Sequence, residues 1–137
     1  MTNTTPLDVA TRYFDALGRG DVPTMMGMLD AEVTWYQPGR NQFSGTHRGV
    51  DGVGRLLGAM MTVSEGTFGL TVEGPMMVNG DQVAVPVRFA GRRDDATMDM
   101  SGIDLLSIVE GKIVAVQLFS ADGDAEDVFW GPSEDSR

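Results

Sequence analysis

The stretch that decides the fold is MDMSGIDLLSIVEGKIVAVQLFS, which runs from Met98 to Ser120. β-branched and large apolar residues dominate both sides of Glu110-Gly111, and this pattern predicts two strands joined by a tight turn. Side chains of a strand alternate between its two faces, so Asp104 shares a face with apolar neighbours. These neighbours are Met98, Met100 and Leu106.

Asp104 is therefore a carboxyl group in an otherwise apolar row. An unpaired charge is costly to bury, so we expect this group either to stay protonated with a raised pKa or to have a partner. A purely structural carboxylate that bonds the backbone is the alternative. We predict Asp104 as the chemical centre of the protein.

The composition excludes several classes of function. The 137 residues fit a single domain, residues 1–137, with a core over roughly residues 6–130 and an acidic tail over 131–137. The absence of Cys excludes disulfides and thiolate sites, and the single His47 excludes a multi-histidine zinc site within one chain, so we expect no metal. A net charge of −10 argues against nucleic acid and membrane partners. No apolar run is long enough to span a membrane and no signal peptide is recognised, so a cytoplasmic protein is expected.

Three helices are predicted from apolar residues at helical spacing. Thr5 caps the first, with Pro6 in its opening turn, and Asp21 caps the second. The third spans Val50 to Met61. The apolar stripes are Leu7, Ala10, Tyr13, Phe14 and Leu17, then Val22, Met25, Met26 and Leu29, then Val50, Val53, Leu57, Met60 and Met61. Tyr13 is therefore predicted to point inward.

The strands complete an α+β pattern. One strand is predicted early, at Glu32 to Gln37, and the loop over residues 39–49 holds at most one short strand. Later, Thr67 to Val72 and Gln82 to Ala90 flank a turn at Asn79-Gly80. The strands before and after Glu110-Gly111 follow, and residues 128–130 anchor an acidic segment against the body. We predict an antiparallel sheet with helices on one side.

Two segments carry a resemblance to a known superfamily. RYFDALGRGDVPTMMGMLDAEVTW near the start and GIDLLSIVEGKIVAVQLFSAD near the end resemble the NTF2-like proteins. These include ketosteroid isomerases, limonene-type epoxide hydrolases and SnoaL-like polyketide cyclases. The resemblance implies a cone-shaped α+β barrel whose curved antiparallel sheet and three helices enclose a pocket. It also matches Tyr13 to the oxyanion-hole tyrosine of the isomerases, and Asp104 to their protonated aspartic acid.

The catalytic base of those isomerases has no counterpart in this chain. At that strand end the sequence reads Trp35-Tyr36-Gln37, and none of these residues removes a carbon-bound proton at neutral pH. The limonene-type arrangement is also absent, because Gly102 stands two residues before Asp104. Strand alternation allows Trp35 with Gln37, or Tyr36, to line the pocket, but not all three.

A narrower similarity is to the epoxide hydrolase/cyclases of polyether ionophore biosynthesis. It is carried by WYQPGRNQFSGTHRG, VSEGTF, MDMSGIDLL and LFSADGDAEDVFWG. The resemblance implies a cofactor-free enzyme with Asp104 as general acid, Glu65 as base and Tyr13 as a supporting donor. Its predicted substrate pocket comprises Trp35, Tyr36, Gln37, Met98, Met100 and Leu106.

Several residues keep a structural interpretation beside the functional one. Tyr13 could be a core tyrosine and Glu65 a solvated loop acid. His47 is interpreted as a surface residue, and Arg88 either extends into solvent or pairs with an acid. The acids near the C-terminus, which are Asp122, Asp124, Glu126 and Asp127, are expected to be solvated.

Three functions remain open at this point. The first is an epoxide hydrolase/cyclase that acts on a small-molecule polyketide. The second is a SnoaL-like aldol cyclase or a double-bond isomerase, and the third is a non-catalytic binding or dimer-partner subunit. Consecutive strands leave one sheet face uncovered, and the resemblance implies a homodimer, or a heterodimer with a paralogue, through that face.

Overall fold

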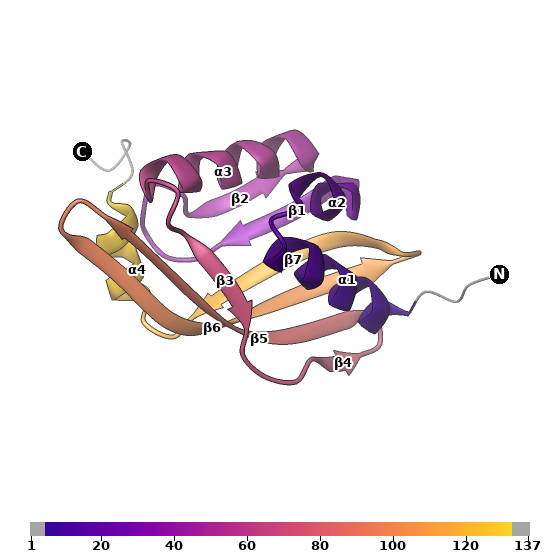
Figure 1. The fold of residues 1–137 in the computed structure, drawn as a ribbon. Helices are drawn as coiled ribbons and strands as arrows, with labels where there is room; N and C mark the ends of the chain where they lie inside the picture. The colour runs from indigo at the N-terminus through magenta and orange to yellow at the C-terminus, as the bar shows by residue number, and fades with distance from the viewer. Residues whose placement is uncertain (1–4, 133–137) are drawn as a thin grey trace.

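The computed structural model describes residues 5–132, which form four helices and seven strands (Figure 1). The helices are α1 (Pro6–Gly18), α2 (Val22–Gly27), α3 (Gly49–Val63) and α4 (Gly123–Trp130). The strands are β1 (Leu29–Gln37), β2 (Gly45–Arg48), β3 (Gly69–Val72), β4 (Met77–Asn79), β5 (Gln82–Arg93), β6 (Ala96–Val109) and β7 (Lys112–Ser120). Most of the predicted acidic tail, residues 133–137, lies outside this range. Within residues 5–132, no helix combines the length and apolar character needed to cross a membrane.

The strands form one curved sheet in the order β2-β1-β7-β6-β5-β3, and β4 pairs with β5. β1 and β7 run parallel, whereas the other neighbouring strands described are antiparallel. The sheet is therefore mixed, and the prediction of an antiparallel sheet is wrong for the pair of β1 and β7. A parallel pair joins strands that are distant in the chain, and no local turn signal marks it. The sheet stays open at its edges.

The two strands around Glu110-Gly111 are confirmed as β6 and β7. Both turn residues have positive φ, 52° and 78°, as a two-residue hairpin of this hand requires. Along β6 the even-numbered residues from Met98 to Ile108 face the interior, and all except Gly102 are buried. The predicted alternation therefore sets the burial of this strand.

The first two helices begin where the sequence places them. Thr5 and Asp8 form a capping box at α1, and the Asp21 side chain accepts a hydrogen bond at the start of α2. Leu7 and Val22 are 41% and 54% exposed, so their predicted inward positions are wrong. Both lie in the first turn of their helices, next to solvent. In α3 the buried face is Val53, Leu56 and Met60, and the predicted Met61 is exposed.

The region between α3 and β6 contains one strand more than predicted. β4 forms a hairpin with β5, and Asn79 pairs with Gln82 across Gly80 and Asp81. Five strands therefore follow α3 instead of four. β5 runs to Arg93, three residues beyond its predicted end at Ala90.

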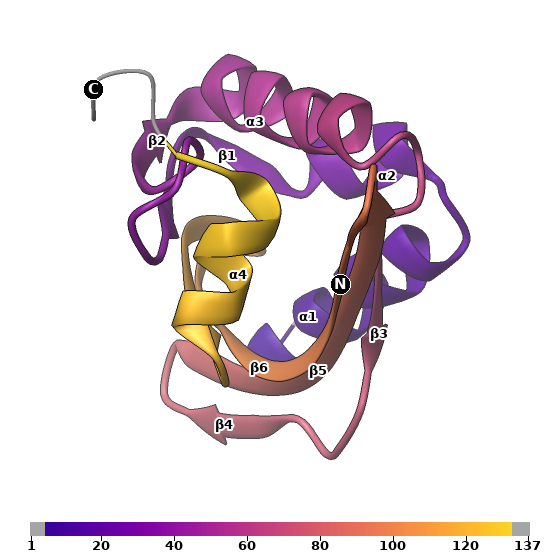
Figure 2. The same ribbon diagram turned by 90° about the vertical axis from the view of Figure 1, so that its left-hand side faces the viewer.

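α4 is a fourth helix where the sequence predicted only an acidic anchor. Asp122 caps it by accepting a hydrogen bond from the backbone N–H of Ala125. Phe129 and Trp130 are buried as predicted, but Val128 is 77% exposed, because successive helical residues point about 100° apart. α4 lies at the opposite end of the curved sheet from α1 (Figure 1), and Figure 2 shows it in front of the curve formed by β5 and β6.

Candidate functional site

Asp104 lies in the middle of β6 on its buried face and is 7% exposed. Its cross-strand neighbours are Val85 on β5 and Leu118 on β7. Burial raises the pKa of Asp104 to about 7, because a carboxylate is poorly solvated among apolar groups. A raised pKa is one of the two outcomes expected from the sequence. At neutral pH this group can both give and accept a proton.

Tyr13 reaches the same interior from α1, which packs against β5 and β6. It is 2% exposed and contacts Phe14 edge to face. Burial, and then the negative charge of Asp104, raise the pKa of the Tyr13 hydroxyl above its ordinary value. The two groups are thus close enough to interact electrostatically, and Tyr13 remains a neutral hydrogen-bond donor.

The polar atoms of Asp104 and Tyr13 are unpaired within the protein and are not fully sealed from solvent. Within residues 5–132, every side-chain nitrogen or oxygen that is sealed from solvent has a hydrogen-bond partner. Neither the Asp104 carboxyl nor the Tyr13 hydroxyl has a partner among these residues, and hydrogen bonding contributes to neither pKa shift. Their oxygens are therefore not fully sealed from solvent and keep their hydrogen-bonding capacity free.

β1 contributes two of its three predicted pocket residues to the interior. Trp35 and Gln37 are 6% and 5% exposed, and the Trp35 Nε1 donates a hydrogen bond to the Gln37 Oε1 at 3.0 Å. Tyr36 is 42% exposed on the opposite face, so its predicted place in the pocket is wrong. The strict alternation of β1 explains the difference.

The remaining predicted pocket residues lie on the same face of β6 as Asp104. Met98, Met100 and Leu106 are 3%, 8% and 0% exposed. They continue the buried face of β6 on both sides of Asp104 with flexible and branched apolar side chains. This row suits an apolar ligand more than a charged one.

Glu65 is not brought to this buried group. It is exposed in the turn that follows α3, with a φ of 56°. Its neighbour Ser64 is fully buried, and the Ser64 hydroxyl accepts a hydrogen bond from the backbone N–H of Phe68. The turn is therefore held by Ser64, while Glu65 points away from the core.

Glu126 is a buried acid that the sequence interpretation placed in solvent. It is 4% exposed in α4, where its carboxylate accepts hydrogen bonds from the Ser120 hydroxyl and the Trp130 Nε1. Burial raises the pKa of Glu126, and these two hydrogen bonds act against that rise. The four-residue spacing of Glu126 and Trp130 was the available signal, because i and i+4 side chains meet on a helix.

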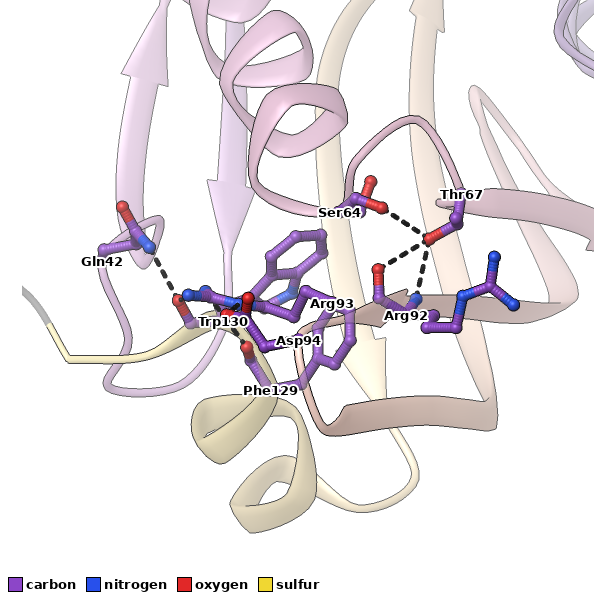
Figure 3. A network of polar contacts seen from close by, with 8 residues as sticks. All are labelled: Gln42, Ser64, Thr67, Arg92, Arg93, Asp94, Phe129 and Trp130. Atoms are coloured by element: carbon purple, nitrogen blue, oxygen red, sulfur yellow. Dashed lines mark hydrogen bonds and ion pairs between the residues drawn. The ribbon is translucent and has the colours of Figure 1, made fainter.

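Hydrogen bonds fasten the end of α4 to two distant segments (Figure 3). The Trp130 carbonyl accepts from the Gln42 Nε2 at 2.7 Å and from the Arg93 guanidinium at 3.0 Å. The Asp127 carboxylate accepts from the backbone N–H of Arg40 and from the Asn41 side chain, both at 2.9 Å. Asp127 is thus also wrongly assigned to solvent.

An open groove of about 510 Å³ lies elsewhere, between β2 and α3. Its lining is Phe43, Thr46, His47, Arg48, Gly52, Arg55, Leu56 and Ala59. No carboxyl group lines it, and the Nε2 of His47 is already bonded to the Phe43 carbonyl at 2.7 Å. We therefore place the candidate site at Asp104 and not in this groove.

Arg88 combines both of its predicted behaviours. It lies on the exposed face of β5 and pairs with Asp99 at 2.7 Å and with Glu73 at 3.4 Å. These surface pairs hold neighbouring strands together on the side away from Asp104. Among residues 5–132, no three His, Asp or Glu side chains converge on a position that could hold a metal.

The chain matches a known protein family over most of its length. The model of the SnoaL-like domain matches residues 10–116, which include both Tyr13 and Asp104. The chain belongs to the SnoaL-like domain family. Its curved mixed sheet with four helices is the NTF2-like α+β fold.

Relatives of this SnoaL-like protein extend over nearly its whole length. It is 46% identical to a protein of unknown function with a cystatin-like fold from Xanthomonas campestris, with a TM-score of 0.89 over 93% of this chain and 98% of that one. It is 30% identical to the uncharacterized protein Rv0034 of Mycobacterium tuberculosis over 95% of this chain and 99% of the relative. A putative polyketide cyclase from Sinorhizobium meliloti shares the fold, with a TM-score of 0.62 and 20% identity over 81% of this chain and 93% of that one.

The buried polar groups of this SnoaL-like protein define its possible chemistry. A protonated Asp104, the Tyr13 hydroxyl and the Gln37 amide are all hydrogen-bond donors on an apolar background. Donors in such a surrounding stabilise negative charge that develops on a substrate oxygen. The arrangement suits acid catalysis on a ligand that carries oxygen atoms.

Proposed function

We propose that the protein is a cofactor-free enzyme that opens an epoxide of a polyketide by attack of an internal hydroxyl, and so closes a cyclic ether. The observation that carries this proposal is Asp104, which is buried on an apolar face without a hydrogen-bond partner among residues 5–132 and has a pKa of about 7. An acid is most effective when its pKa lies near the working pH. Tyr13 adds a second neutral donor next to it.

In this reaction one C–O bond breaks and another forms, and a proton is transferred by way of Asp104. Asp104 gives its proton to the oxirane oxygen while one C–O bond of the strained ring breaks. The substrate hydroxyl forms the new C–O bond, and its proton then returns to the Asp104 carboxylate. Reactant and product are isomers, so no oxidant or reductant is needed.

This reaction fits the site better than removal of a carbon-bound proton. A dedicated base is required for that step, and Glu65 lies outside the buried group. The carboxylate of Glu126 is already bonded to Ser120 and Trp130. In epoxide opening, Asp104 with a pKa near 7 would both donate the proton and later accept one.

A second candidate is a SnoaL-like cyclase or isomerase that acts on a ketone. Tyr13 next to Asp104 favours it, because two donors could share one carbonyl oxygen as it becomes an enolate. A structure of the same fold carries the description putative polyketide cyclase. In this case Asp104 could not act as donor and base at the same moment, so the substrate must enolise in two steps.

The deciding experiment compares wild type with Asp104→Asn on hydroxy-epoxides and on unsaturated ketone analogues, by product mass and retention time. We expect ring closure on epoxides only, with a loss of roughly 100- to 10,000-fold in the variant. The matched control is Asp99→Asn, an exposed acid on the same strand, which should retain activity. Equal activity of Asp104→Asn and wild type would refute the site. Turnover of ketones alone would favour the second candidate, and no turnover by any protein would favour a binding subunit.

A further inference from the structure

Gln37 is a buried amide whose orientation is fixed by its neighbour. It is 5% exposed on the interior face of β1, and the Trp35 Nε1 donates to its Oε1 at 3.0 Å. An indole N–H can only donate, so the amide oxygen must be the atom that faces Trp35. The NH₂ group therefore points away from Trp35.

The NH₂ group of Gln37 has no acceptor among residues 5–132. Since the sealed side-chain nitrogens and oxygens in this range all have partners, the Gln37 Nε2 is not fully sealed from solvent and its N–H groups are free to donate. Polar groups that are more than nine-tenths buried are rarely left unpaired without a reason. An unpaired donor in an apolar interior favours a ligand that supplies an acceptor.

The strand register places this donor at the level of Asp104. Tyr36 pairs with Gln117, so the next residue, Gln37, lies beside Leu118. Leu118 in turn pairs with Asp104 on β6. Gln37 and Asp104 are thus two strands apart on the same concave face, roughly 10 Å between Cα atoms. One ligand can contact both side chains.

The charge of the surroundings indicates what kind of ligand this is. The buried polar side chains among the described residues are Gln37, Asn41, Ser64, Asp104 and Glu126, to which the Tyr13 hydroxyl is added. None of them is a cation, so an anionic ligand would find no counter-charge in this interior. The net charge of −10 also disfavours the approach of an anion.

We propose that Gln37 is a substrate-binding residue that donates a hydrogen bond to a carbonyl or ether oxygen of an uncharged ligand, while Asp104 acts on another oxygen of the same molecule. This assignment rests on the proposed function for the role of Asp104. Trp35 is the positioning residue, because its hydrogen bond holds the amide with the NH₂ group toward the ligand. The site thereby selects oxygenated, neutral molecules over hydrocarbons and acids.

Three small probes of similar shape test the proposal. Acetophenone carries an acceptor oxygen, α-methylstyrene replaces that oxygen by a CH₂ group, and benzoate replaces the methyl ketone by an anion. Titrations followed by ¹H–¹⁵N NMR give the affinity of each probe and the shift of the Gln37 side-chain NH₂ signals, which are identified by their absence in Gln37→Met. We expect wild type to bind acetophenone roughly two- to tenfold more tightly than α-methylstyrene, and benzoate most weakly.

Three variants distinguish the contribution of the Gln37 amide to binding from that of neighbouring residues. Gln37→Met keeps the length and apolar volume of the side chain and should bring the ketone-to-alkene ratio close to one. Trp35→Phe should lower the ratio, because the amide is no longer held in one orientation. Gln117→Met, an exposed glutamine on the adjacent strand, should keep the wild-type ratio.

Two results would overturn the proposal. One is a wild-type protein in which acetophenone leaves the Gln37 NH₂ signals unmoved, a measurement that needs no folded variant. The other is an unchanged ketone-to-alkene ratio in Gln37→Met. The ratio is expected to persist in Asp104→Asn, so failure of the ring-closure assay with an intact ratio would refute the proposed reaction and leave the role of Gln37 standing.

Discussion

Asp104 links its own ionisation to the stability of the fold. Its pKa is about 7 in the folded chain and has an ordinary value of 3.8, so the folded state binds this proton more tightly than the unfolded state. The stability that the proton contributes is present in full below a pH of about 4, falls as the pH rises, and is lost above a pH of about 7. At about 1.36 kcal/mol per pKa unit, the total effect is on the order of 4 kcal/mol.

Replacing Asp104 by Asn should remove this pH dependence. The measured quantity is the free energy of unfolding of wild type minus that of Asp104→Asn. This difference should be about 2–3 kcal/mol larger at pH 5 than at pH 8, because Asn imitates the protonated acid at every pH. Urea unfolding of both proteins at the two pH values measures it. Asp99→Asn on the exposed face serves as the control, and parallel pH profiles for Asp104→Asn and wild type would contradict the raised pKa.

Gly102 lies so close to its neighbours that no room is left for a side chain. A Cβ atom there would overlap with the Phe119 carbonyl oxygen and would lie 2.8 Å from the Phe89 ring. We therefore expect Gly102→Ala to destabilise the protein by roughly 1–3 kcal/mol in urea unfolding, because overpacking strains the backbone. Gly58→Ala is the matched control, since nothing lies within 4 Å of its Cβ position on α3. It should be neutral or stabilising by up to about 1 kcal/mol, and equal effects of both changes would contradict the close contact.

The sequence predicted individual residues best where a simple period determines burial. Asp104 and Tyr13 were placed inside from strand alternation and helical spacing, and both are buried. Glu65 and Glu126 each lie in a polar segment, and the four-residue spacing of Glu126 and Trp130 distinguishes them only once that segment is known to be a helix. Only the packing of α4 against the sheet buries Glu126 beside Trp130, and that packing is tertiary.

At the scale of elements, α4 is held by its aromatic residues more than by its own helix propensity. An isolated helix of 8 residues is too short to be stable in water. Trp130 is fully buried and contacts the rings of Phe43, Phe68 and Phe129 at centroid distances of 4.9–5.4 Å. Phe43 and Phe68 come from separate parts of the chain, so the helix was not evident from local pattern. Its formation depends on the assembled fold.

Removing the Trp130 ring should therefore cost far more than removing an exposed side chain from the same helix. We expect Trp130→Ala to lower the free energy of unfolding by about 3–5 kcal/mol, because it leaves a cavity and removes one of the two hydrogen-bond donors to Glu126. Val128→Ala, at a position that is 77% exposed, should change it by less than about 0.5 kcal/mol. Chemical denaturation measures both, and similar losses for the two variants would contradict this account of α4.

At the scale of the whole molecule, the order of the strands was the least predictable property. Hairpins such as the one between β6 and β7 follow from turn residues. The parallel contact of β1 with β7 joins Tyr36 to Gln117, which are far apart in the chain and share no turn. It is nevertheless the contact that brings Gln37 to the level of Asp104, so the geometry of the site follows from the part of the topology that local pattern does not contain.

The outer face of the sheet leads to the last prediction, which concerns assembly. Phe119 and Tyr36 are 47% and 42% exposed on this face, and Phe119 lies in register with Ile103 and Pro86 across three strands. Such an apolar surface is typical of a contact between protein chains, and we expect it to join two copies of this chain. Each copy carries a net charge of −10, so the copies repel one another and their association should tighten as salt screens the charges.

Analytical ultracentrifugation tests this at two salt concentrations. Phe119→Arg should shift the protein toward monomer, because it places charge in the centre of an apolar contact, whereas Val128→Arg on exposed α4 should not. A dimer that weakens with added salt would show that ion pairs and not this face join the copies. A wild-type protein that is monomeric throughout would exclude the homodimer and leave a paralogue as the partner for this surface. Asp104 lies on the opposite, concave face, so Phe119→Arg should keep the ring-closure activity, provided that each copy forms its site alone.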